Sequence, residues 1–171
     1  MMFEPNDQGL GLSQDPCITL GHEGSGYVEE VGSDVKNFKK GDPVGFIPAK
    51  DCCYECGPCR KTHNQWCKTG KVKMHGFATN GFFQEYVTVD ARSAMVLPSE
   101  LDVASAAPLF CAGVTSFHGV ENCGLKPGQW MAIVGCGGLG HLGVAYAKYG
   151  VCSTYCKYLS LTNNLGQWDS K

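Results

Sequence analysis

Three features are scarce in this sequence, and each scarcity excludes a class of protein. No apolar run approaches the roughly 18 residues that a membrane-spanning helix needs. The opening residues, MMFEPNDQGL, lack the basic start and the apolar segment of a secretory signal. The chain also has no large excess of either charge, because 14 basic and 16 acidic residues leave a net charge of −2. We therefore expect a cytoplasmic protein with no membrane and no nucleic acid among its partners, since phosphate-backbone binding requires a basic surface.

Glycine and cysteine, in contrast, are abundant. The 171 residues include 23 glycines and 11 cysteines, and 43% of the chain is hydrophobic. This length accommodates one domain plus part of another, with enough apolar side chains for a core. Because thiols inside cells stay reduced, clustered cysteines here indicate a metal site before they indicate disulfides.

The first half of the chain predicts short strands joined by tight turns. Between Cys17 and Phe46, turn sequences at 32–34 and 41–43 separate short apolar segments. This pattern is typical of a small β-barrel or sandwich. Residues 82–89 predict a further strand, because they are rich in aromatic and β-branched side chains.

The second half predicts helices and the opening of a different fold. Residues 99–107 predict a short helix with Ser99 as its N-cap, and residues 111–122 predict a second helix. The apolar run 130–134 then enters a glycine turn, and residues 141–149 place apolar side chains at helical spacing. A strand, a glycine turn and a helix in succession indicate the start of a parallel α/β unit.

The most specific motif is a four-cysteine cluster in the lobe formed by residues 50–73. Its spacing, C-x2-C-x2-C-x7-C, allows a short loop to fold four soft ligands around one tetrahedral zinc ion; the ligands are Cys53, Cys56, Cys59 and Cys67. The alternative is a set of free or disulfide-linked cysteines. Cys52 is expected to stand outside the site, although an exchange with Cys53 stays open. Four protein ligands leave no coordination position for a substrate, so we expect this zinc ion to stabilise the lobe.

Basic residues surround this lobe: Lys50, Arg60, Lys61, Lys68, Lys71 and Lys73. Four thiolates and one Zn²⁺ carry a net charge of about −2, which these side chains can offset. A basic rim around zinc also suggests a nucleic-acid zinc finger. The cysteine spacing differs from the C2H2 pattern, however, and no recognition helix follows it.

A second, open metal site is indicated by two weaker patterns. His22 and Glu23 stand in the turn GHEGSG, and Cys111 begins a predicted helix after Pro108. The dipole of a helix N-terminus lowers the pKa of a thiol, so we expect Cys111 to favour the metal-binding thiolate. Taken alone, a turn histidine and a small cysteine are more often structural.

A glycine-rich turn indicates a dinucleotide site. Gly135, Gly137, Gly138 and Gly140 fit G-x-G-x-x-G between the predicted strand and helix. The first glycine permits a tight turn, the second lets a pyrophosphate approach the backbone, and the last lets the helix pack closely on the strand. The alternative is a tight turn without a ligand. Residues 151–168 contain no acidic side chain of the kind that contacts the ribose in such sites.

Taken together, these motifs resemble one family. GHEGSG, the four-cysteine loop, CAGVT and the glycine turn, in this order, resemble the zinc-dependent alcohol dehydrogenases of the medium-chain dehydrogenase/reductase family, most closely the yeast-type and bacterial enzymes. The resemblance covers residues 16–150. It implies a mainly β GroES-like catalytic domain over 1–126 with an incomplete N-terminus, the start of a Rossmann α/β domain over 127–150, and a divergent tail over 151–171.

The resemblance also implies residue roles. His22 and Cys111 match two ligands of the catalytic zinc, and Glu23 matches a carboxylate beside it. Thr115 matches a residue that lines the nicotinamide pocket. The lobe cysteines match structural zinc ligands, and the four glycines match the cofactor turn. The implied reaction is hydride transfer between a primary or secondary alcohol, or its aldehyde or ketone, and NAD or NADP.

Other family features have no match in this sequence. The upstream cysteine that supplies a further zinc ligand is absent, and Cys17 is not expected to replace it. We therefore expect a chain truncated at both ends, with impaired activity. The other histidines are interpreted as ordinary polar positions: His63, His75, His118 and His141.

Two alternatives stay open. The chain could be a non-catalytic, zinc-braced module that associates with a full-length relative, whereas an enzyme of this family could form homo-oligomers. Alternatively, the enzyme class holds but the substrate is a polyol or a bulkier alcohol. Pro48 and Ala49 favour that second alternative, because they stand where yeast-type relatives carry an aromatic pocket residue.

Overall fold

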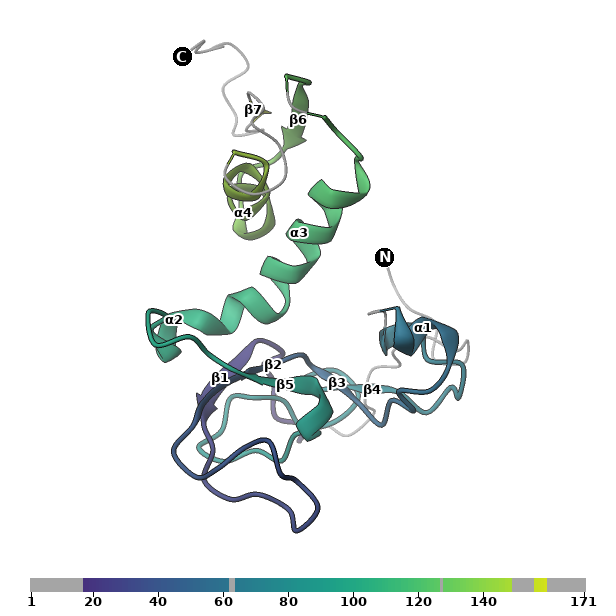
Figure 1. Ribbon diagram of the computed structural model, residues 1–171, viewed down its shortest axis with the longest axis vertical. Helices are drawn as coiled ribbons and strands as arrows, with labels where there is room; N and C mark the ends of the chain where they lie inside the picture. The colour runs from purple at the N-terminus through teal and green to yellow at the C-terminus, as the bar shows by residue number, and fades with distance from the viewer. Residues whose placement is uncertain (1–16, 62–63, 127, 149–155, 160–171) are drawn as a thin grey trace. The chain divides into compact units, whose positions relative to one another are not determined.

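The computed structural model describes residues 17–61, 64–126 and 128–148, and the backbone of 156–159 (Figure 1). Contacts between residues divide the chain into two compact units, Met1–Cys111 and Ala112–Lys171. Each unit has its own secondary structure and its own core, so each is described by itself. The predicted domain boundary between 126 and 127 stays a prediction.

The first unit is built on a small antiparallel sheet. Strands β1 (Gly24–Tyr27), β2 (Pro43–Phe46) and β5 (Ala94–Val96) lie in the order β1-β2-β5, with Gly24 opposite Phe46 and Phe46 opposite Ala94. A shorter ribbon pairs β3 (Ala49–Lys50) with β4 (Lys73–Met74). Since this ribbon closes the chain on itself at 50 and 73, the residues between form a separate lobe.

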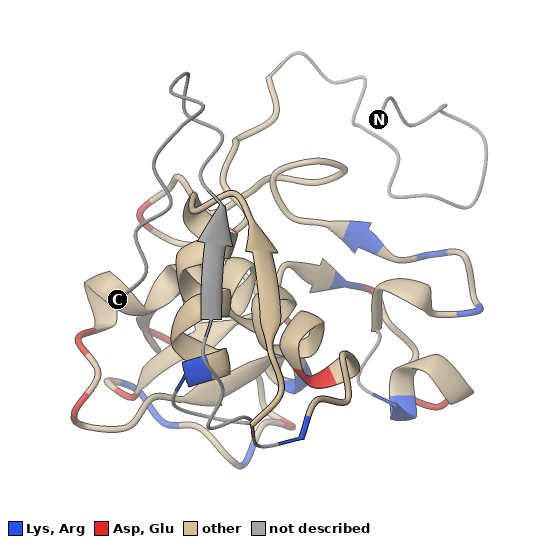
Figure 2. Ribbon diagram, turned by 90° about the horizontal axis from the view of Figure 1, so that it is seen from above, with Lys and Arg blue, Asp and Glu red and all other residues tan. Residues whose placement is uncertain are grey.

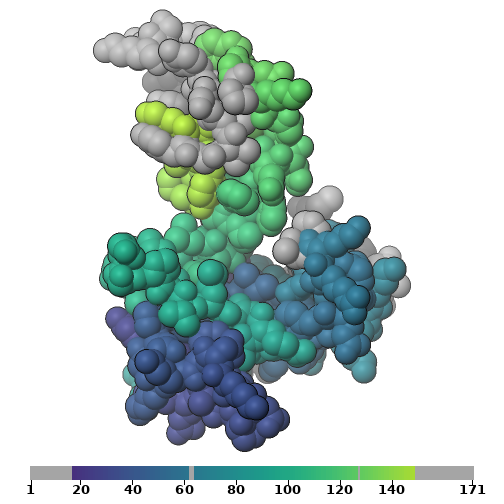
Figure 3. Space-filling view, viewed as in Figure 1, coloured from purple at the N-terminus to yellow at the C-terminus, as the bar shows by residue number. Residues whose placement is uncertain are grey.

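The lobe contains little regular structure and a core made mostly of sulfur. It holds the short helix α1 (Gly57–Arg60) and the 3₁₀ turn η1 (Asn64–Trp66). Its buried residues are Ala49, Cys52, Cys59 and Cys67. In Figure 3 the lobe is the rounded blue projection beside the purple residues of the sheet. Ile47, Tyr54, Val72 and Met74 pack against this cluster only partly buried, and a core this small is usually supplemented by a metal or a disulfide.

Short helical segments cover the sheet. They are η2 (Ala91–Ser93), α2 (Val103–Ala106) and η3 (Ala107–Phe110). Leu97, Ala106 and Phe110 form the core here, and the Ser25 hydroxyl donates to the carbonyl of Val103 at 2.6 Å. A side chain at position 45 would overlap the ring of Phe110. The sheet and the segment that ends at Cys111 are thus in direct contact.

Two expectations for this unit were wrong. Asp102, and not Ser99, caps α2: its carboxylate accepts from the amide of Ser105 at 3.0 Å, and an ionised carboxylate is a strong acceptor at a helix N-terminus. Residues 82–89 do not form a strand. Phe82 and Phe83 donate to the carbonyls of Gly21 and Leu20, so this segment is held by a few irregular bonds instead of a ladder.

The second unit confirms the predicted strand, turn and helix. It comprises α3 (Ala112–Asn122), β6 (Met131–Val134), α4 (Gly138–Tyr146) and β7 (Cys156–Leu159), with β6 and β7 parallel. Its core contains Val120, Met131 and Ala147. The helix begins earlier than predicted, at Gly138, so that the last glycines of the turn lie inside it.

Within the described residues, no single helix is long and apolar enough to cross a membrane. The segments Val103–Phe110 and Ala112–Asn122, which are separated by a break, reach the required length and composition only as a pair.

The contact between Gly45 and Phe110 gives a first prediction. Gly45→Ala forces the buried Phe110 ring to move, so we expect the free energy of unfolding to fall by about 1–3 kcal/mol, the usual cost of overpacking. Gly26→Ala is the matched control, because an added methyl there meets nothing within 4 Å. Urea unfolding followed by circular dichroism measures both. Equal stability of the two variants would contradict the prediction.

Candidate functional site

The structure brings the four predicted lobe cysteines together. The Sγ atoms of Cys53, Cys56, Cys59 and Cys67 all lie within 4.8 Å of one another, and those of Cys53 and Cys59 are 3.9 Å apart. Zinc–sulfur bonds of about 2.3 Å in a tetrahedron place sulfurs about 3.8 Å apart. The donor set and its spacing therefore fit a zinc ion. Cys52 lies outside the cluster, with its thiol 3.5 Å from the carbonyl of Asn64.

Backbone amides point at these sulfurs. The amide of Cys53 donates to Cys67 Sγ at 3.4 Å, and the amides of Glu55 and Cys56 donate to Cys53 Sγ at 3.5 and 3.3 Å. Such donors stabilise sulfur in its charged form and orient it, as outer-shell groups do around metals. These amides therefore favour the charged form of Cys53 and Cys67.

The thiols differ in acidity. The Thr69 hydroxyl, 3.2 Å from Cys67 Sγ, lowers the pKa of Cys67 to about 6, whereas burial raises the pKa of Cys59. Burial likewise raises the pKa of Cys52 to about 11. Four converging thiols cannot all be deprotonated without a cation to offset their charge, so metal binding and proton release are coupled here.

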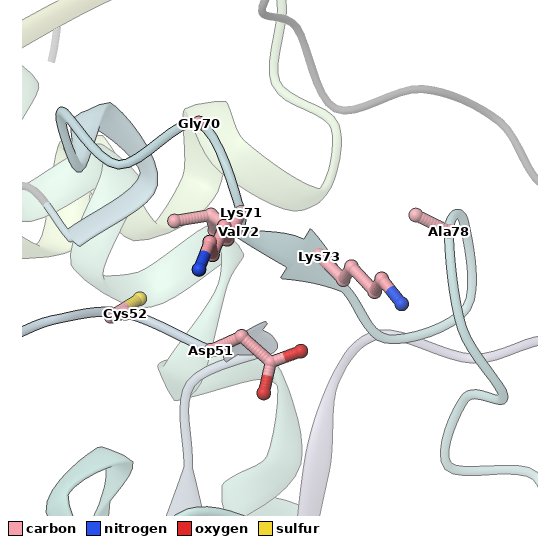
Figure 4. Close-up of a pocket in the computed structure, with 7 residues that line it drawn as sticks. All are labelled: Asp51, Cys52, Gly70, Lys71, Val72, Lys73 and Ala78. Atoms are coloured by element: carbon pink, nitrogen blue, oxygen red, sulfur yellow. The ribbon is translucent and has the colours of Figure 1, made fainter.

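Basic and acidic residues are interspersed along the chain (Figure 2). The lobe itself lines most of a pocket of about 690 Å³, to which Asp51, Cys52, Lys71 and Lys73 contribute (Figure 4). Its lining carries both signs of charge. None of the four clustered cysteines lines it, so the pocket is separate from the proposed metal position.

The second predicted cluster is also assembled. Donor atoms of His22, Glu23 and Cys111 lie within 4.8 Å of one another, although Cys111 is distant in sequence. His22 and Glu23 immediately precede β1, and Cys111 follows η3. One nitrogen, one carboxylate and one sulfur are ligands that zinc accepts, and fewer than four protein donors leave room for a further ligand.

The expected acidity of Cys111 was wrong. Burial raises the pKa of this thiol, and the nearby carboxylate of Glu23 raises it further. Cys111 has φ −133° and ψ −75°, so it precedes α3 instead of lying in its first turn, and desolvation outweighs the helix dipole. Only a cation between the two groups would favour the thiolate.

The loop at residues 76–81, which the sequence analysis did not identify as functional, packs against His22 and the turn that carries it. The ring of Phe77 lies 5.0 Å from the imidazole of His22. Gly76 has φ +80°, and a Cβ there would lie 2.5 Å from the carbonyl of Gly21, so the loop approaches the turn as only glycine can. The amide of Thr19 donates to the Asn80 side chain at 3.0 Å. The only sequence signal for this loop is its Asn-Gly pair at 80–81.

The glycine turn also has the expected geometry. Gly135 has φ +88°, and a Cβ on Gly140 would overlap the carbonyl of Gly135. A Cβ on Gly137 or Gly138, in contrast, would have none of the described residues within 4 Å. Gly137 precedes the first turn of α4, whose amides lack partners within the helix. The surface over these two glycines is therefore open to a ligand that contacts backbone.

The remaining candidates lie elsewhere. Thr115 is exposed on α3 of the second unit, and Cys17 is exposed and lies outside both clusters. His75 is buried and bonds through Nδ1 to the carbonyl of Asn80 at 2.6 Å. His118 pairs with Glu121, and His141 with the carbonyl of Gly137. His63 lies outside the described residues.

Comparison with known proteins gives a consistent result. Residues 5–99 match the family model described as the alcohol dehydrogenase GroES-like domain. An alcohol dehydrogenase of Rhizobium meliloti (strain 1021) is 39% identical over 78% of this chain and 39% of its own length, and one of Geobacillus stearothermophilus is 41% identical over 75% and 37%. The chain thus spans about two fifths of the length of these relatives.

Solved structures agree. The alcohol dehydrogenase of Aeropyrum pernix superposes with a TM-score of 0.71 at 35% identity, over 81% of this chain and 41% of that one. A cobalt- and zinc-bound thermostable alcohol dehydrogenase of Pyrobaculum aerophilum gives 0.73 at 28% identity, over 85% and 44%. The GroES-like fold expected from the sequence is confirmed.

The four-cysteine cluster gives a second prediction. The purified chain should retain about one zinc per molecule at this cluster, and Cys56→Ser should lose it, because three thiolates and a weak hydroxyl donor bind zinc poorly. Elemental analysis after gel filtration measures the content. Cys123→Ser is the control, since Cys123 is exposed and lies outside the cluster. An unchanged zinc content in Cys56→Ser would remove the assignment.

Proposed function

Because this chain belongs to the medium-chain alcohol dehydrogenase family, we propose that it takes part in oxidation of an alcohol by a nicotinamide dinucleotide, with one zinc at His22, Glu23 and Cys111 and another in the four-cysteine lobe. The observation that carries the proposal is the cluster of His22, Glu23 and Cys111, whose donor atoms lie within 4.8 Å of one another.

The number of protein ligands gives the two proposed zinc ions different roles. The lobe offers four sulfurs and closes its site, so its ion braces the loop. The cluster at His22 has three donors and leaves a position for the alcohol oxygen. A zinc ion bound there would act as a Lewis acid, stabilising negative charge on that oxygen.

The surrounding residues orient these donors. Phe77 packs against the His22 ring and restricts its rotation, while the glycine contact at Gly21 fixes the turn that carries it. Burial and the neighbouring carboxylate of Glu23 raise the pKa of Cys111, so a cation held between the two groups would favour the thiolate. In the proposed reaction these residues would place the alcohol, and a bound nicotinamide cofactor would supply the hydride acceptor.

We propose that the cofactor's pyrophosphate is held at Gly135–Gly140. Support comes from the open surface over Gly137 and Gly138 and from the parallel strands β6 and β7, which are typical of the first unit of a Rossmann domain. The choice of NAD or NADP stays open, and Thr115 is proposed to line the nicotinamide pocket. The expected self-association, and the impaired turnover expected from the sequence, stay predictions.

The metal site gives a third prediction. Zinc-dependent NADH formation from a small primary alcohol should fall in His22→Ala by more than the roughly 100-fold loss that removal of an outer-shell partner costs, because a direct ligand is gone. Initial rates at 340 nm measure the effect. His118→Ala is the matched control, since His118 lies on α3 and pairs with Glu121.

The outcomes distinguish the two kinds of function. Equal rates in His22→Ala and the unaltered chain would place the activity elsewhere. A folded chain that keeps its four-cysteine zinc but shows no activity would instead favour the non-catalytic module. The rate of the unaltered chain also measures the impairment that the sequence leads us to expect.

The glycine turn gives a fourth prediction. Gly137→Ala adds a methyl group where the folded chain has open space, so stability should change little, while NADH affinity should fall about tenfold because the methyl blocks the backbone's approach to the pyrophosphate. Titration of NADH fluorescence measures this. Gly119→Ala, also into open space but within α3, should bind NADH normally. Unchanged affinity in Gly137→Ala would contradict the proposed site.

A further inference from the structure

The chain enters the four-cysteine lobe through an unusual piece of backbone. Asp51 and Tyr54 have φ of +62° and +58°, and they are the two residues other than glycine with positive φ in the part of the chain that the structure describes. Aspartate tolerates this conformation, but it is unfavourable for a bulky residue such as Tyr54 and persists there only where the surroundings impose it. Cys53, a member of the sulfur cluster, lies between these two residues.

The Tyr54 side chain is fixed at its hydroxyl end. Its hydroxyl is hydrogen-bonded to the Ser93 hydroxyl, and Ser93 donates to the carbonyl of Ala49 at 3.1 Å. Because the Ser93 proton is used toward Ala49, Tyr54 is the donor in the bond between the two hydroxyls. Ser93 is buried, so these groups exchange little with water. The bond joins the lobe to the turn that precedes β5.

The Tyr54 ring is fixed from its face as well. The guanidinium of Arg92 lies 4.2 Å from the ring centroid. Asp90 holds that guanidinium with two bonds, Nε to Oδ1 at 3.0 Å and Nη2 to Oδ2 at 2.8 Å. A planar, doubly bonded guanidinium over an aromatic face is a favourable arrangement that an ammonium group reproduces poorly.

Tyr54 also adjoins the bonds that stabilise the sulfurs. The next two amides, of Glu55 and Cys56, donate to Cys53 Sγ. The amide of Cys53 itself donates to Cys67 Sγ. These three amides belong to the backbone turn at 51–54 or directly follow it, and the same turn carries the Tyr54 ring.

We propose that Tyr54, held by Ser93 and Arg92, is a positioning residue for the four-cysteine zinc site. It touches neither the ion nor a substrate. By holding the strained turn closed it keeps Cys53 and its amide donors in the tetrahedral arrangement, and thereby slows release of the metal. This inference rests on the proposed zinc in the lobe.

The test measures metal release rather than activity. Zinc transfer from the intact chain to an excess of a coloured chelator is followed for the unaltered chain, Tyr54→Phe and Tyr86→Phe. Tyr54→Phe should start with the same zinc content and release it about fivefold faster, the factor that corresponds to the net contribution of one neutral hydrogen bond. Tyr86→Phe, which changes an exposed tyrosine, should match the unaltered chain.

Two further readouts separate positioning from general destabilisation. In a Ser93→Ala background, Tyr54→Phe should accelerate release no further, because the partner of its hydroxyl is already gone. With cobalt in place of zinc, the thiolate-to-cobalt absorption of Tyr54→Phe should be altered while that of Tyr86→Phe is not. Arg92→Lys should accelerate release, whereas Arg60→Lys, on α1, should not.

The possible failures are distinct. If the unaltered chain holds zinc and Tyr54→Phe releases it at the same rate, the positioning role is overturned while the metal assignment stands. If release accelerates equally with and without Ser93, the hydrogen bond is not the cause and the proposal also fails. If the unaltered chain holds no zinc at its four cysteines, both the metal assignment and this inference are overturned.

Discussion

Convergence of four sulfurs within a few ångströms is the constraint on which the first unit depends. The lobe between β3 and β4 has almost no apolar core, and three of its four buried residues are cysteines. Without a cation, these thiols stay partly protonated and hold the loop only weakly. With a cation, the same atoms would cross-link the loop. The amides around Cys53 and the Thr69 hydroxyl are already oriented for the charged form of the sulfurs.

The metal-binding residues could be predicted from the sequence because their chemistry is local or highly specific. Four cysteines within a short loop can converge on one ion without contributions from distant parts of the fold. The glycine turn could be predicted as well, because its glycines meet requirements of the local backbone. His22 and Cys111 are distant in sequence, and only the resemblance to a family connected them before the structure did.

Other features could not be predicted, because they arise from tertiary contacts. Phe82 and Phe83 have strong strand propensity, yet their amides bond to the segment carrying Gly21, which no propensity encodes. The acidity of Cys111 depends on burial and on Glu23, and both outweigh the helix dipole that the sequence suggested. Tyr54 and Ser93 carry no motif at all. Their importance comes from a hydrogen bond between residues far apart in the chain.

The missing side chain at position 45 has a consequence for how related chains can diverge. The Phe110 ring occupies the space that a Cβ on Gly45 would fill, and Phe110 directly precedes a proposed zinc ligand. The two positions should therefore covary among homologues: a larger residue at 45 should be accompanied by a smaller one at 110. Where position 110 keeps a large residue, we expect glycine to be retained at position 45, because selection on the neighbouring proposed ligand limits changes there.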